Sequence, residues 1–141
     1  MGDFEQGSVH LERLLEVMRL TSPSPNVTNM ITSRVIPLIA RITGLADRLE
    51  VAEAAAQTVL SSPSVMPAIA QAVVSGLALL AVVRGDAAAA QQQYDRLQHM
   101  RGTNLMLVIT PVDRLLGLLA HTMGNLDQAV ADFEDSLTLC R

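Results

Sequence analysis

Four carboxylates near the end of the chain are the first residues whose type and spacing could do chemistry. They fall within nine residues of one another: Asp127, Asp132, Glu134 and Asp135. Carboxylate oxygens in such a cluster are suitable ligands for a divalent cation. At helical spacing, however, Ala129 and Phe133 would face inward and the acids would spread around the outer side. A solvated acidic face is therefore favoured, and we expect no bound metal.

Nucleophilic chemistry has little support. Cys140 is the only cysteine, and with no histidine placed as its base it is better interpreted as a small core residue. His121 could titrate near neutral pH, but no second His or Cys stands at metal-ligand spacing. No nucleophile–base pair or phosphate-binding loop can be assembled. We therefore expect no catalytic residues, no cofactor and no enzymatic activity.

Charge and composition exclude some classes of partner. Arg34, Arg41 and Arg48 recur every seven residues and could form an anion-binding stripe, although Gly44 breaks the helix between them. The net charge of −4 and the lack of a basic run argue against nucleic-acid binding. Acids precede the first apolar run, which is unlike a signal peptide. We therefore expect a cytoplasmic protein.

A membrane span is the main alternative for the uncharged segment 65–83. Its length would suffice to cross a bilayer. Pro67, Gln71, Ser75 and Gly76 interrupt the apolar residues, and aromatic anchors are missing at its ends. A buried helix in a helical stack gives the same signal. We therefore expect a core helix and no membrane partner.

Glycines and prolines divide the chain into about seven helices with no sheet, an all-α fold. The expected helices cover 9–20, 27–43, 45–60, 64–83 and 87–100, then a sixth beginning at Pro111 and a seventh after Gly124-Asn125. Ser8 is the expected N-cap of the first and Thr110 of the sixth. The second helix either contains Pro37 or begins there.

An internal repeat of 39 residues organises the second half of the chain. The matched pairs are Leu77-Ala78 with Leu116-Gly117, Ala81 with Ala120, Gly85 with Gly124, Ala90 with Ala129, and Tyr94 with Phe133. Leu116-Gly117, followed by Ala129 and Phe133 four residues apart, resembles the tetratricopeptide repeat, whose period is about 34 residues. The resemblance implies antiparallel hairpins stacked as a short right-handed α-solenoid.

The same resemblance suggests where partners bind. In tetratricopeptide hairpins the first helix lines the concave face, and its outward positions contact the partner. Carried onto this sequence, those positions are Ser75, Leu79, Arg114, Leu118 and His121. Arg114 could pair with a peptide carboxylate, although a solvated arginine beside a neighbouring acid is favoured.

The apolar stretch 105–109 supplies the residues by which this repeat exceeds the usual period. Apolar loops are rarely left bare, so this one must be covered. Packing on the domain, or extension of the sixth helix, is favoured. The alternative is that Leu105 and Leu107 cover the groove or form a dimer contact.

Taken together, the sequence predicts one helical-repeat domain over 1–141, as a fragment of a longer protein. It comprises degenerate N-terminal hairpins over 8–60 and tetratricopeptide-like hairpins over 64–104 and 110–141. The last stretch is also similar to helical-repeat regions of large bacterial signalling proteins that carry ATPase, cyclase or LuxR-type domains. The expected function is binding of a protein or a parent-chain domain, with homodimerisation through exposed apolar helix faces as a further mode. The alternative is a regulatory sensor that holds a small ligand between the helices.

Overall fold

The chain folds almost entirely into helices, as the sequence predicts. The computed structural model describes residues 4–21, 24–44, 46, 48–105 and 110–139. Within those ranges the elements are α1 (Phe4–Thr21), α2 (Pro25–Thr43), α3 (Leu49–Leu60), α4 (Pro67–Arg84), α5 (Ala87–Leu97), the 3₁₀ turn η1 (Gln98–Met100), β1 (Asn104–Leu105), β2 (Thr110–Pro111), α6 (Val112–Thr122) and α7 (Leu126–Leu139).

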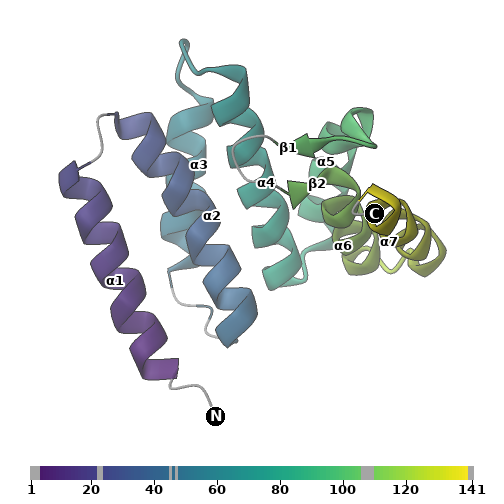
Figure 1. The fold of residues 1–141 in the computed structure, drawn as a ribbon, viewed down its shortest axis with the longest axis horizontal. Coiled ribbons are helices and arrows are strands. Elements are labelled where there is room, and N and C mark those ends of the chain that lie inside the picture. The colour runs from purple at the N-terminus through teal and green to yellow at the C-terminus, as the bar shows by residue number, and fades with distance from the viewer. Residues whose placement is uncertain (1–3, 22–23, 45, 47, 106–109, 140–141) are drawn as a thin grey trace.

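Helix α4 joins the two halves of the molecule. It packs against α2 and α3 on one side and against α5 and α6 on the other. Figure 1 shows α1, α2 and α4 side by side in one half, with α5, α6 and α7 gathered in the other. Helix α1 contacts α2 at one end of this arrangement, and α7 packs on α6 at the other.

The turns that end α4 and α6 are built alike. Gly85 and Gly124 both have left-handed φ angles, 65° and 81°, which a residue without a Cβ adopts at little cost. After Gly85, the Asp86 N–H donates to the Ala81 carbonyl at 3.0 Å; after Gly124, the Asn125 N–H donates to the Ala120 carbonyl at 2.9 Å. The 39-residue repeat of the sequence is thus a repeat of the same hydrogen-bonded turn.

The residues that follow each turn also match. The Asp86 carboxylate caps α5 by accepting from the Ala89 N–H at 3.0 Å, and the Asn125 side chain accepts from the Gln128 N–H at 3.4 Å. These polar side chains satisfy backbone donors that a helix start leaves free. Each turn therefore ends one helix and begins the next, which folds the pair back as a hairpin.

Small residues let the paired helices approach closely, as the repeat pattern indicates. A Cβ added at Gly117 of α6 would lie 2.7 Å from the Cε1 atom of Phe133 in α7, so the ring packs directly on the glycine. Ala90 and Ala129, the matched small residues of α5 and α7, are both buried. The ring and the small residues thus set the spacing of the hairpin.

Five local predictions about helix ends and strands are corrected or resolved. Thr110 does not cap α6: it pairs with Leu105 in a two-stranded antiparallel ladder, so the prediction of no sheet is wrong. Ser8 lies inside α1 and does not precede it. Pro37 is buried inside a continuous α2. Helix α4 starts at Pro67, a residue that suits the first turn because its missing N–H has no partner there anyway.

Helix α4 is the one element of the described chain that is long and apolar enough to cross a membrane, judged by length and composition alone. A buried core helix satisfies the same criterion. Residues of α4 belong to each of the three apolar clusters of the core: Ala78, Leu79 and Ala81 in one, Leu80 in the second and Val73 in the third. The packing is that of a core helix.

At Gly76 the backbone of α4 lies close to the backbone of α2. A Cβ added there would lie 2.6 Å from the Ser33 backbone oxygen and 3.0 Å from the Ser33 carbonyl carbon. Backbone atoms of a packed helix cannot rotate away as a side chain can. The approach of these two helices therefore depends on the absence of a side chain at residue 76.

We expect Gly76→Ala to destabilise the protein by about 1–3 kcal/mol through overpacking, although alanine in a helix interior normally gains about 1 kcal/mol over glycine. Urea unfolding measures the difference. The control is Gly117→Ala combined with Phe133→Leu, in which the obstructing ring is removed and the loss should be smaller. A Gly76→Ala variant as stable as the wild type would contradict this packing.

Candidate interaction surface and its polar network

Two residues that the tetratricopeptide resemblance places on the concave face are buried. Ser75 is fully buried and Leu79 is 4% exposed. The Ser75 hydroxyl donates to the Ala72 carbonyl of its own helix at 2.6 Å. Both residues lie on α4, which has neighbouring helices on two sides. The prediction that these side chains point outward is wrong for that reason.

Other predicted contact residues have mixed exposure. Arg114 and His121 of α6 are exposed, whereas Leu118 is half-buried against the apolar cluster shared by α4, α5 and α6. Leu105 is 2% exposed and belongs to the same cluster, so it packs on the domain. Leu107 lies outside the described residues.

Arg114 has an unpredicted neighbour. It lies close enough to Arg41 of α2 for the two positive charges to repel, which brings together elements far apart in the sequence. Burial, and then this repulsion, lower the pKa of Arg41. In the part of the chain that the structure describes, neither guanidinium has an ion-pair partner. We call Arg41 and Arg114 the arginine pair.

The seven-residue arginine stripe is only partly formed. Arg34 lies two helical turns before Arg41, on the same face of α2. It is half-buried, which lowers the pKa of its guanidinium, and its Nε atom lacks a hydrogen-bond acceptor. Arg48 lies beyond Gly44, where the helix ends, and pairs with Glu12 of α1. The stripe is therefore interrupted after Arg41.

The acidic cluster of α7 is not wholly a solvated face. Asp127, Glu134 and Asp135 are exposed, as expected, but Asp132 is fully buried. Among the residues with described positions, no three His, Cys, Asp or Glu side chains come together as a metal-ligand group. Cys140 lies outside those residues. Asp132 has a different role, which the sequence pattern did not reveal.

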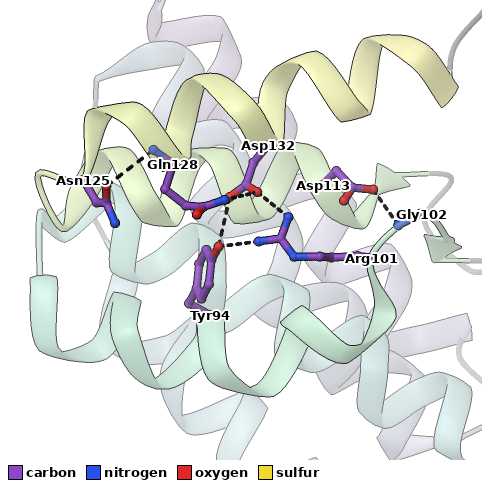
Figure 2. A network of polar contacts seen from close by, with 7 residues as sticks. All are labelled: Tyr94, Arg101, Gly102, Asp113, Asn125, Gln128 and Asp132. Carbon is purple, nitrogen blue, oxygen red and sulfur yellow. Dashed lines mark hydrogen bonds and ion pairs between the residues drawn. The ribbon is translucent and has the colours of Figure 1, made fainter.

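Asp132 is the centre of a polar network between α5 and α7 (Figure 2). Its carboxylate accepts from the Tyr94 hydroxyl at 3.2 Å, from the Gln128 side-chain amide at 2.9 Å and from the Arg101 guanidinium. Arg101 also donates to the Tyr94 hydroxyl. Beside this network, the Gly102 N–H donates to the Asp113 carboxylate at 2.9 Å. These bonds connect the chain after α5 to α6 and α7.

The network shifts the ionisation of two of its members. Burial raises the pKa of the Tyr94 phenol, and the neighbouring Asp132 charge raises it further against the opposing effect of Arg101. Partial burial opposes the charge on Arg101, but its hydrogen bond to Asp132 and the charge of that carboxylate raise its pKa overall. The folded chain thus favours a neutral phenol and a charged guanidinium.

We interpret the network as structural. The buried carboxylate is already met by three donors of its own chain, so a buried charge that would be costly alone is compensated. Sequence spacing missed it because its members come from three separate segments. The sequence held one signal for the network: Asp132 directly precedes Phe133, which was expected to face the interior.

The two end helices expose apolar side chains. On α7 they are Leu126, Val130, Leu137 and Leu139, and on α1 they are Val9, Leu14, Val17 and Leu20. Each of these two helices thus presents an exposed apolar face. Association through these faces, including homodimerisation, stays a prediction.

Comparison with models of protein families, with curated proteins and with solved structures yields no match for this chain.

Tyr94 is the only tyrosine, and the chain contains no tryptophan, so phenolate absorbance reports this one group. We expect its titration midpoint to lie above 10 in the folded protein and to fall on unfolding. We also expect Asp132→Asn to lower the midpoint, because it removes a negative charge that favours the neutral phenol. Equal midpoints in the folded and unfolded chains would contradict the geometry of the network.

The raised pKa of Tyr94 also makes the free energy of unfolding depend on pH. The folded protein holds the Tyr94 proton more tightly than the unfolded chain, so this contribution to the free energy of unfolding is present below pH 10. It is lost as the pH rises through the folded-state pKa. Tyr94→Phe should remove that alkaline component and is the control for the stability measurement.

Proposed function

We propose that this chain is a non-catalytic interaction module that binds an acidic segment of another protein, or of another domain of its parent chain, across α2 and α6. The observation that carries this proposal is the arginine pair. Burial, and then the charge of Arg114, lower the pKa of Arg41, and within the described chain neither guanidinium has an ion-pair partner.

An anionic partner would relieve this repulsion. The planar guanidinium of arginine donates two parallel hydrogen bonds to a carboxylate, which gives both affinity and orientation. The protein as a whole is acidic, with a net charge of −4, so two neighbouring uncompensated cations are a local exception. Such an exception steers an anionic segment to one place on the surface.

The proposed architecture is a short right-handed α-solenoid of the tetratricopeptide type. Its support is the matched pair of turns at Gly85 and Gly124 and the packing of Phe133 on Gly117. In such a solenoid the first helices of successive hairpins, here α2, α4 and α6, form one face. We propose that this module acts in the cytoplasm, within bacterial signal transduction or transcription regulation.

A direct test uses a fluorescent peptide of alternating glutamate and leucine with a free C-terminal carboxylate. We expect Arg41→Gln and Arg114→Gln each to weaken binding by about fivefold to tenfold, as for the loss of one charge-assisted hydrogen bond, and added salt to weaken wild-type binding. The measurement is fluorescence anisotropy.

The matched control is Arg13→Gln, which removes the same charge from an exposed position on α1. It should leave peptide affinity nearly unchanged. Equal losses in all three variants would indicate a general charge effect and would contradict a site at the arginine pair.

A further inference from the structure

The second helices of the hairpins bury equivalent positions. In chain order the buried residues are Ala52, Ala55 and Val59 on α3 (with Leu49 and Ala56), Ala90, Gln93 and Leu97 on α5, and Ala129, Asp132 and Ser136 on α7. Gln93 and Asp132 therefore occupy the same place in successive hairpins. Both are polar, and both face the helix of the preceding hairpin.

The two positions differ in the hydrogen-bond donors that surround them. Asp132 accepts from Tyr94 and Arg101, which reach it from the preceding hairpin. Matching Ala52 with Ala90 places Ala56 where Tyr94 stands and Pro63 where Arg101 stands. Alanine and proline side chains carry no hydrogen-bond donor. Gln93 thus lacks the donors that its counterpart has.

The consequence is an unsatisfied buried atom. Gln93 is 4% exposed, and its Oε1 atom has no hydrogen-bond partner. Its amide nitrogen makes only a long contact, 3.4 Å, to the Gln92 side chain. Buried polar groups without partners are rare in native structures, and each one requires an explanation.

A cavity lies at the same place. It has a volume of about 470 Å³, within the range of small-molecule sites, and is lined by α3, α4 and α5. Its polar lining includes Gln57, Ser61, Gln92 and Gln93, with Leu77 among the apolar residues. Gln93, whose Oε1 atom lacks a donor, is thus one of the residues that line the cavity.

The charges of the lining indicate the ligand's charge. The Arg84 guanidinium donates to the Glu53 carboxylate at 2.7 Å and is thereby compensated. The Asp86 carboxylate caps α5. Arg96 also lines the cavity, and no ion pair to it occurs among the described residues. The lining therefore offers one cation without an ion pair, Arg96, and one carboxylate, Asp86, whose printed partner is a backbone N–H.

We propose that this cavity binds a small polyhydroxylated anion, a sugar acid or a sugar phosphate. A ligand hydroxyl donates to Gln93 Oε1, as the Tyr94 hydroxyl does to Asp132. The side-chain amides and the Ser61 hydroxyl bind further hydroxyls, and Arg96 binds the anionic group. This site lies between α3 and α5 and does not depend on the interaction proposed for the arginine pair.

Isothermal titration calorimetry with four probes separates the requirement for hydroxyl groups from the requirement for an anionic group. Gluconate carries hydroxyls and a carboxylate on six carbons; sorbitol keeps the hydroxyls without the charge, and hexanoate keeps the charge without the hydroxyls. We expect gluconate to bind at least about tenfold more tightly than either. Glucose 6-phosphate tests the other anion: tighter binding than gluconate identifies phosphate, and weaker binding identifies carboxylate.

Variants then locate the site. Gln93→Leu and Arg96→Gln should each weaken gluconate binding by about tenfold or more. Gln93→Leu should also raise the melting temperature, because it replaces an unsatisfied buried amide by an apolar group of similar size. Gln91→Leu is the matched control, since Gln91 is exposed on the same helix and should leave binding unchanged.

The proposal is overturned if neither gluconate nor glucose 6-phosphate binds saturably at up to about 10 mM. Binding that survives both Gln93→Leu and Arg96→Gln also overturns it. Arg114→Gln should have no effect on gluconate, so failure here is distinguishable from failure of the acidic-peptide interaction.

Discussion

The burial of α4 on two sides is the constraint on which the remaining structure depends. A charge inside a helix enclosed in this way would be costly, and α4 carries none before its last residue, Arg84. It must also present a small residue where its backbone approaches a neighbour, and Gly76 against Ser33 meets this need. Because α4 contributes to all three apolar clusters, the first hairpins and the last share one interior.

The gap between α5 and α7 is filled differently from the gap between α3 and α5. Between α5 and α7, long polar side chains bridge the gap and satisfy a buried carboxylate. Between α3 and α5, the corresponding residues are short, so the same gap stays open as a cavity beside an unsatisfied amide. One repeated geometry thus yields a structural contact in one place and a candidate ligand site in the other.

The sequence predicted the fold class because its signals are local. Helical spacing and glycine turns give the helices and hairpins, and the 39-residue match of Gly85 with Gly124 is reproduced in the backbone hydrogen bonds. Periodicity could not tell whether Ser75 faces solvent or a neighbour, because that depends on how many helices surround α4. Thr110 was assigned to a cap because the strands that pair it with Leu105 are two residues long, too short to leave an alternating pattern in the sequence. The approach of Arg41 to Arg114 and the network at Asp132 are tertiary, and one sequence contains no local signal for either.

Native-state hydrogen exchange tests the central claim, that the hairpins share one interior through α4. Amides of α4 and α6 should share the highest opening free energy and the same strong denaturant dependence, since they are exposed only by global unfolding. Amides of the end helices α1 and α7 should open at lower free energy. Exchange of α4 in a separate, less stable unit with α1 would contradict the account.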